Sequence, residues 1–193
     1  MKKLAILGII ALAHTAQAGY LEDGNSYFKN NNYPKAEQMY LKAIKENDGE
    51  IEAIYNLGLL YQKQNKLDKA EQMYLKASQK GYIDAMNNLG VLYYDQKKFD
   101  KAEQMFLEAS QKGEIEAMYN LGTLYYEQNK FGKAKEMFLK AIQKGHVKAM
   151  YNLGILYYNQ NDRINAKKYV KQASDLGYEE AQEVYKKMLQ AGY

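Results

Sequence analysis

Apolar residues recur along the chain at helical spacing, and the whole pattern repeats at a fixed interval. In one stretch, Ile115, Met118, Leu121 and Tyr125 follow each other at steps of three and four, which places them on one face of a helix. The glycines of the Asn-Leu-Gly segments lie at positions 58, 90, 122 and 154, so the interval between them is a constant 32. A fixed period in this range predicts a stacked array of repeats rather than one globular core.

The pattern divides the chain into helix–turn–helix units. We expect a partial unit at 20–47, four full units at about 50–81, 82–113, 114–145 and 146–177, and a polar capping helix at 178–191. First helices are predicted at about 50–63, 82–95, 114–127 and 146–159, and second helices at about 67–80, 99–112, 131–144 and 163–176. Each unit alone would expose an apolar face, so we expect neighbouring units to cover it.

Glycines occupy two kinds of position in this scheme. Those at 81, 113, 145 and 177 stand where a second helix should stop. Those at 58, 90, 122 and 154 lie inside first helices, where glycine costs about 1 kcal/mol relative to alanine. We therefore expect a neighbouring helix to approach closely there. The opposing surface is predicted to be small, formed by Ala70, Ala102, Ala134 and Ala166.

Residues 1–18 have the pattern of a secretory signal peptide. Met1-Lys2-Lys3 is basic, residues 4–13 are apolar, and Ala16-Gln17-Ala18 is a small-residue cleavage pattern. The apolar part is too short for a stable membrane span, although an uncleaved N-terminal anchor is the alternative. We expect the repeat domain, residues 19–193, to be periplasmic or secreted, without a stable membrane span after cleavage.

Charge and cysteine content narrow the possible partners. The full chain carries a formal net charge of +4 from 27 basic and 23 acidic side chains, and removal of Lys2 and Lys3 leaves +2. This balance does not supply the strongly basic face that nucleic-acid binding needs, so no nucleic-acid partner is expected. The chain has no cysteine, so its stability has to come from packing rather than from disulfides.

Residues suited to catalysis or metal binding are sparse. Beyond the signal segment the one histidine is His146, whose repeat equivalents are Tyr82 and Glu114, and we expect it to be solvated. There is no cysteine nucleophile, paired histidine or glycine-rich phosphate loop after a strand. Serines at repeat-equivalent positions near second-helix ends are interpreted as packing or capping residues: Ser78, Ser110 and Ser174. We predict no enzymatic activity, no cofactor and no metal site.

The repeated motif resembles a known family. Asn-Leu-Gly-x-Leu-Tyr-Tyr, the spacing from Tyr125 to Ala134, and then Phe138 and Ala141 are similar to the tetratricopeptide repeat. The Lys-Gly junctions at 80–81, 112–113 and 144–145 resemble the related Sel-like repeat of exported bacterial proteins. The period of 32 is shorter than the tetratricopeptide 34, and the longer Sel-like loop is absent, so the choice between these families stays open. Both imply an all-α, right-handed α-solenoid of stacked antiparallel helix pairs.

The resemblance also implies that the first helices line a concave groove. Their groove face lies opposite the core stripe and is formed in the third unit by Tyr119, Asn120, Thr123 and Tyr126. Asparagine offers a donor and an acceptor to an extended peptide, and tyrosine supplies apolar area with a hydroxyl. In tetratricopeptide proteins asparagine at this place often contacts bound peptide. The candidate peptide-binding residues are Asn56, Asn88, Asn120, Asn152, Tyr55, Tyr94, Tyr119, Tyr126, Tyr151 and Tyr158.

Alternatives remain for this face and for the function. The asparagines could instead bond to neighbouring helices while the tyrosines only cover the face. The leading hypothesis is an exported, non-enzymatic scaffold that holds a peptide or protein segment in the groove. A β-lactamase-like or penicillin-binding Sel-like repeat protein is the enzymatic alternative, although such proteins are rich in cysteine. A membrane-surface adaptor using the lysine-rich second helices is a third, disfavoured by their mixed charges at Lys101, Glu103, Glu108 and Lys112.

Overall fold

The computed structural model describes residues 19–192, and within them the chain is helical without strands. The predicted signal peptide, residues 1–18, lies outside the described residues. Contacts divide the chain into two compact units, residues 1–92 and 93–193, and this boundary falls within α6. Across residues 19–192, every helix falls short of the length and apolar character that a membrane span requires.

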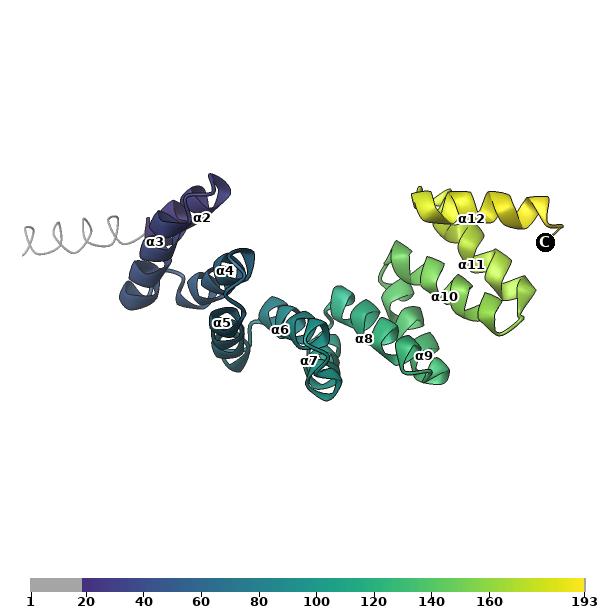
Figure 1. Ribbon diagram of the computed structural model, residues 1–193, viewed down its shortest axis with the longest axis horizontal. Coiled ribbons are helices and arrows are strands. Elements are labelled where there is room, and N and C mark those ends of the chain that lie inside the picture. The colour runs from purple at the N-terminus through teal and green to yellow at the C-terminus, as the bar shows by residue number, and fades with distance from the viewer. Residues whose placement is uncertain (1–18, 193) are drawn as a thin grey trace, which may run out of the picture. The chain divides into compact units, whose positions relative to one another are not determined.

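The helices follow one another in the predicted order (Figure 1). The first unit contains α2 (Tyr20–Lys29), α3 (Tyr33–Glu46), α4 (Glu50–Lys63), α5 (Leu67–Gln79) and most of α6 (Ile83–Asp95). The second contains α7 (Phe99–Gln111), α8 (Ile115–Glu127), α9 (Phe131–Gln143), α10 (Val147–Asn159), α11 (Arg163–Asp175) and α12 (Glu179–Gln190). In the full repeats, the helices begin and end at the predicted positions or at the residue next to them.

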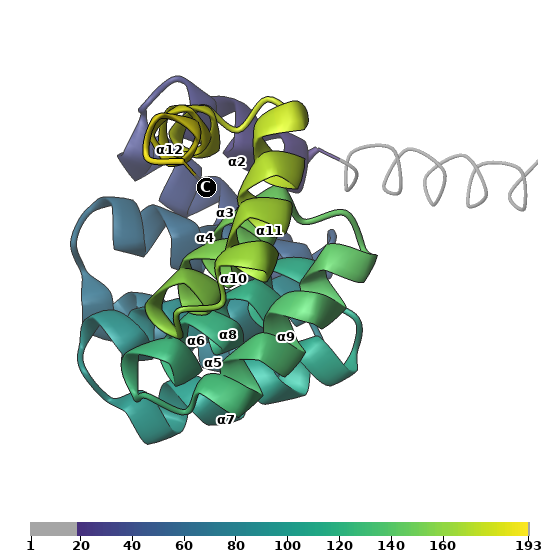
Figure 2. The same cartoon turned by 90° about the vertical axis from the view of Figure 1, so that its right-hand side faces the viewer.

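Consecutive helices pack in pairs, which confirms the predicted all-α solenoid. In the first unit α2 packs against α3 and α4 against α5, while α3 also contacts α4. In the second unit α8 packs against α9 and α10 against α11, as Figures 1 and 2 show, and α11 contacts α12. The even-numbered helices are the first helices of their repeats, and the odd-numbered helices are the second.

A residue in the left-handed backbone conformation follows the helix at the turns within a helix pair and at the turns between pairs. Within a pair, Asn65 has φ of 57°, and the next N–H, of Lys66, donates to the carbonyl of Tyr61 at 2.8 Å. Between pairs, Gly81 has φ of 89°, and the N–H of Tyr82 donates to the carbonyl of Ala77 at 3.1 Å. Both closures satisfy carbonyls that a helix end would otherwise leave unpaired. The glycine stops were predicted, whereas the asparagine turns were not.

The glycines inside first helices lie against a large side chain of the second helix in the same pair. A Cβ added at Gly58 would lie 2.7 Å from the ring of Tyr74, and one at Gly122 would lie 2.7 Å from the ring of Phe138. The expectation of a close approach is therefore confirmed. A ring of the second helix fills the space at Gly58 and Gly122, where a small surface was expected. At Gly154 an added Cβ would instead lie 2.7 Å from Val170 and 3.3 Å from the carbonyl oxygen of the predicted Ala166.

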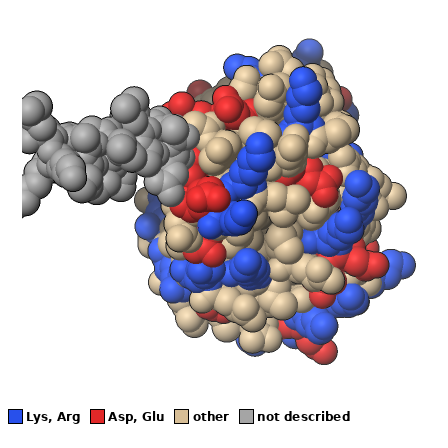
Figure 3. Space-filling view, turned by 90° about the vertical axis from the view of Figure 1, so that its left-hand side faces the viewer, with Lys and Arg blue, Asp and Glu red and all other residues tan. Residues whose placement is uncertain are grey.

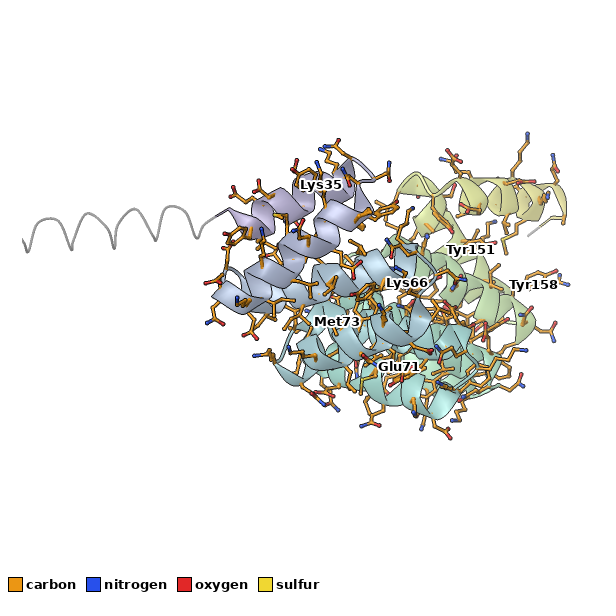
Figure 4. All side chains as sticks on the ribbon, turned by 60° about the vertical axis from the view of Figure 1, so that its left-hand side comes forward. Lys35, Lys66, Glu71, Met73, Tyr151 and Tyr158 are labelled. Atoms are coloured by element: carbon orange, nitrogen blue, oxygen red, sulfur yellow. The ribbon has the colours of Figure 1, made fainter. Side chains whose placement is uncertain are left out.

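Contacts between successive repeats involve tyrosines whose rings are nearly buried. The Tyr61 hydroxyl donates to Glu37 Oε1 at 2.8 Å, and burial with this carboxylate raises the pKa of Tyr61 to about 12. The Lys66 and Lys69 ammonium groups lie 5.9 and 5.1 Å from the centre of the same ring. Figure 4 labels Lys66 at the start of α5. The equivalent Tyr125 donates to Glu103 at 2.9 Å in the second unit.

Candidate functional site

The predicted asparagines take part in hydrogen bonds between successive repeats. Asn88 Nδ2 donates to the Tyr55 hydroxyl at 3.0 Å in the first unit, and Asn152 Nδ2 donates to the Tyr119 hydroxyl at 3.3 Å in the second. In both cases the partners are 33 residues apart. Asn56 makes a related bond to Asn25 at 2.8 Å. This is the arrangement that the alternative interpretation predicts.

Two further tyrosines of the candidate set bond across the α6–α8 and α8–α10 steps within the second unit. The Tyr94 hydroxyl donates to Glu127, and Asn159 Nδ2 donates to the Tyr126 hydroxyl at 2.5 Å. Both partners again lie 33 residues apart in sequence. Burial, followed by the Glu127 carboxylate, raises the pKa of Tyr94. The hydroxyls therefore hold neighbouring first helices together at the C-terminal ends of these helices.

His146 is not solvated as predicted. Its side chain is only 9% exposed, and its ring stacks on Tyr119 with centroids 4.6 Å apart. Nδ1 accepts the N–H of Ala149 at 3.1 Å, which caps α10. Because Nδ1 accepts this bond, Nε2 is the ring nitrogen that donates, and it lies 3.1 Å from Glu116 Oε1. The start of each first helix meets the preceding repeat, so a ring at this position is covered.

The remaining candidate residues lie on α8 and α10. Tyr151 packs against Tyr178 with ring centroids 5.3 Å apart, and burial raises its pKa. Tyr158 is 48% exposed, and Figure 4 shows both tyrosines on α10. Asn120 is half-buried on α8. Most of the described hydrogen bonds of the candidate residues therefore run to a neighbouring repeat, and their contact with a peptide remains a prediction.

Two neighbouring pockets open on the groove face of the second unit. The first has a volume of about 220 Å³ and is lined by Thr123, Tyr126, Glu127, Phe138, Asn152 and Ile155. The second has about 240 Å³ and is lined by Ile155, Tyr158, Val170, Val184, Lys187, Met188 and Ala191. Thr123, Tyr126 and Phe138 of the first pocket correspond to Ile155, Tyr158 and Val170 of the second, because one repeat period separates the members of each pair. The pockets are therefore two versions of one site.

The residues that form the floor and far wall of these pockets were not among those predicted from the sequence. Phe138 and Val170 belong to second helices, which were expected to serve only the core. Val184 and Met188 belong to α12, which was interpreted as a polar capping helix. A signal was present, because Val184 stands one repeat period after Asn152 and so continues the first-helix pattern. The site therefore draws on both helices of a repeat and on the first helix of the next.

The serines behave as packing residues. The Ser78 hydroxyl donates to the carbonyl of Leu75 at 2.8 Å, and the Ser110 hydroxyl donates to that of Leu107 at 2.8 Å. Each bond lies within one helix, so each hydroxyl hydrogen is donated to a backbone carbonyl of its own helix. In residues 19–192 there is no cluster of three or more His, Cys, Asp or Glu side chains suited to a metal ion.

Comparison with protein families gives matches along the described chain. A tetratricopeptide repeat model matches residues 21–81 and 55–114, and a model described as plant tetratrico peptide repeats matches residues 92–190. The chain belongs to the tetratricopeptide repeat family. The resemblance to the Sel-like repeat remains a prediction from the sequence. A search of curated proteins found no match.

Solved structures share this fold at low sequence identity. The pilF protein of Pseudomonas aeruginosa is 22% identical, with a TM-score of 0.71 and 93% of each chain covered. YrrB, described as a tetratricopeptide protein with an unusual peptide-binding site, is 22% identical, with a TM-score of 0.65 over 92% of this chain and 97% of that one. Yeast Tom70 is 20% identical, with a TM-score of 0.78 over 94% of this chain and 42% of its own.

Proposed function

We propose that this tetratricopeptide protein is an exported, non-enzymatic scaffold that binds a peptide or protein segment on the groove face of its first helices. The observation that carries the proposal is the pair of equivalent pockets, which open side by side on this face and share Ile155. Concave, mostly apolar sites with a few polar groups are the usual form of a binding site. Proteins built from this repeat generally act as interaction scaffolds.

Within this proposal, the candidate asparagines and tyrosines have two roles. Their bonds between repeats hold the pocket walls in place, as the Asn152–Tyr119 bond does beside the first pocket. Their remaining polar atoms, together with the exposed ring of Tyr158, would contact the bound segment. A peptide would therefore place side chains in the pockets and its backbone along the candidate residues. The peptide-binding site described for YrrB supports this use of the fold.

Charge supports a protein partner rather than a polyanion. Figure 3 shows Lys and Arg side chains interspersed with Asp and Glu on the face that it presents. Surfaces of mixed sign are typical of ordinary solvated faces, whereas nucleic-acid binding requires a basic stripe. We also propose export, because residues 1–18 have a signal-peptide pattern. Mass spectrometry of the protein purified from its native cells tests this, since cleavage after Ala18 leaves Gly19 at the N-terminus.

The binding proposal can be tested at Ile155, which lines both pockets. The full chain, with a C-terminal affinity tag on a flexible linker, is used to recover partners from the native cell envelope and culture fluid. Ile155→Glu should abolish recovery, because it places a charge in both pockets. Ile155→Thr is the matched control, since the equivalent position already holds Thr123. Equal recovery by the wild type and Ile155→Glu would contradict binding at this face.

A further inference from the structure

The first pocket has the chemistry of a site for a basic side chain. Its floor is the ring of Phe138, which is 1% exposed as a residue, and Tyr126 forms a wall. Glu127 lies at the rim, and its Oε1 accepts the Tyr94 hydroxyl. Among residues 19–192 no ion pair of Glu127 is found. A lysine or arginine stem can lie along such rings while its charge reaches the carboxylate.

The second pocket instead suits an uncharged aliphatic side chain. The residues that line it are mainly apolar: Ile155, Val170, Val184, Met188 and Ala191. Its one charged group, Lys187, is already paired with Glu183 at 2.8 Å. A ligand carboxylate would have to displace Glu183, whereas a leucine- or methionine-sized side chain gains free energy simply by leaving water. The replacement of Phe138 by Val170 and of Asn152 by Val184 produces this difference between the two pockets.

The charge of Glu127 favours the same ligand. Glu116 and Glu127 are the exposed acids of α8, but Glu116 lies in the first turn of the helix, where it contacts His146. Glu127 lines the pocket, so it is the acid that complements a positively charged residue on the bound segment.

We infer the conformation of the ligand from the spacing of the repeats. The pockets occupy successive repeats and share Ile155, and helices packed side by side lie about 8–10 Å apart, so we assign about this distance to the two bound side chains. A polyproline II helix returns a side chain to the same face every third residue, after about 9 Å. In a β-strand, same-face positions are about 7 Å apart for two residues and about 13 Å for four. A separation of three residues in polyproline II conformation therefore fits both pockets at once.

We propose that the second unit recognises a peptide in which a lysine or arginine and an aliphatic residue are three positions apart. The basic side chain occupies the Phe138 pocket and pairs with Glu127, and the aliphatic side chain occupies the Val170 pocket. The peptide lies across α8, α10 and α12 in polyproline II conformation. This inference rests on the proposed function and specifies its ligand.

Synthetic peptides test the spacing. Fluorescein-labelled decapeptides carry one Lys and one Leu separated by two, three, four or five positions, in both orders, within a Pro/Ser background. Fluorescence anisotropy with the full chain should show the tightest binding at a separation of three, by about tenfold, since that ratio corresponds to about 1.4 kcal/mol. Equal affinity at all separations would overturn the proposal, and so would an optimum at any other separation.

Two variants test the pockets separately. Glu127→Gln should remove the preference for Lys over Gln in the peptide, while Glu108→Gln, at an exposed carboxylate of α7, should leave it unchanged. Val170→Phe should fill the second pocket and remove the preference for Leu over Ala. Phe106 and Phe138 occupy the equivalent positions, and circular dichroism checks that folding is retained. Persistence of either preference in its variant would overturn the assignment of that pocket.

The same measurements separate this inference from the proposed function. If no decapeptide binds but partner recovery still depends on Ile155, the ligand assignment is wrong and the scaffold proposal stands. If recovery is also insensitive to Ile155→Glu, both are wrong. Binding at a separation of three that requires both pockets supports both.

Discussion

Two equivalent junctions between repeats, α4–α6 in the first unit and α8–α10 in the second, share one hydrogen bond. Asn88 donates to Tyr55 at 3.0 Å in the first, and Asn152 donates to Tyr119 at 3.3 Å in the second. In both junctions a ring of the second helix packs against a glycine of the earlier first helix. A Cβ added to that glycine would lie 2.7 Å from the ring in each case. The framework that sets the approach of the helices is therefore the same.

The two junctions differ at the floor of the groove face. In the first unit the floor residue is Tyr74, whose hydroxyl donates to Gln62 at 2.6 Å. In the second it is Phe138, which has no hydroxyl, and Tyr126 takes the place of Gln62. A pocket of about 220 Å³ adjoins Phe138. Two substitutions thus distinguish the junctions, because Tyr74 bonds to Gln62 whereas Phe138 presents an apolar ring beside Tyr126.

The largest expected effect is the response of the first junction to alkaline pH. Burial raises the pKa of Tyr74, and the pKa of Tyr40 in the same unit rises to about 12. A tyrosine with a raised pKa contributes stability that is fully present below pH 10 and is lost as pH rises through the higher value. We expect the free energy of unfolding to fall between pH 10 and 12, with Tyr74 contributing to that loss in the first unit and Tyr94 and Tyr125 contributing in the second.

Absorbance at 295 nm and circular dichroism, followed together, check this loss of stability. In wild-type protein, ionisation of the buried tyrosines should coincide with loss of helix. Tyr74→Phe removes the hydroxyl and gives the first junction the floor residue of the second. Its free energy of unfolding should fall less than that of the wild type as pH rises from 10 to 12. An identical pH dependence would show that the Tyr74 hydroxyl does not distinguish the junctions.

The glycine contacts come next, and they should affect both junctions equally. Gly58→Ala and Gly122→Ala would each force a Cβ against a buried ring, so each should lower the free energy of unfolding by about 1–3 kcal/mol. Gly132→Ala, inside α9 with no atom within 4 Å of the added Cβ, should instead raise it by up to about 1 kcal/mol. Urea unfolding measures all three. A neutral Gly122→Ala would contradict the close approach.

The asparagine bonds should give an effect of intermediate size. Asn88→Ala and Asn152→Ala should each lower stability by about 1 kcal/mol, because each leaves a tyrosine hydroxyl without its donor. The loss should be greater for Asn88, whose amide also bonds the Tyr74 hydroxyl. Double-mutant cycles with Tyr55→Phe and Tyr119→Phe isolate the two bonds. Coupling energies near zero would mean that these asparagines serve only ligands.

The smallest expected effect concerns one turn. In the turn between the two helices of a repeat, the residue in the left-handed conformation is an asparagine in the other described repeats. In the turn between α6 and α7 it is Lys97, with φ of 59°. Asparagine tolerates this conformation better than lysine, because its short side chain can bond locally. Lys97→Asn should therefore raise the melting temperature slightly, and Asn129→Lys should lower it by a similar amount. Thermal unfolding of both variants measures this, and opposite signs would contradict the turn assignment.

The helices could be predicted closely because their signals are local. Apolar spacing, glycine stops and the constant period each lie within about one repeat, so Ile115, Leu121 and Gly122 suffice to place α8. Residues 1–18 lie outside the described part, so the signal peptide and export remain predictions. The resemblance of the Asn-Leu-Gly motif to the tetratricopeptide repeat is confirmed by the family match, whereas the resemblance to the Sel-like repeat remains a prediction.

The site was harder to predict because its partners lie in different repeats. The bond from Asn152 to Tyr119 spans 33 residues, and helix periodicity alone does not say which faces of successive repeats meet. His146 was misplaced for the same reason, since its cover comes from Tyr119 of the preceding repeat. Phe138 was assigned to the core, although its ring also forms a pocket floor. The candidate residues were placed on a common face, but their partners required the structure.

The constant separation of bonded partners has a consequence for how such a chain can change in length. In the bonds from Tyr119 to Asn152 and from Tyr126 to Asn159, each repeat supplies a hydroxyl to the next and an amide to the one before. An in-frame duplication of a segment as long as one whole repeat would carry both halves of these contacts with it. Duplication or loss of a complete repeat would therefore leave a hydroxyl facing an amide at the new junction between repeats. An insertion of a few residues would instead separate the two partners of one such hydrogen bond.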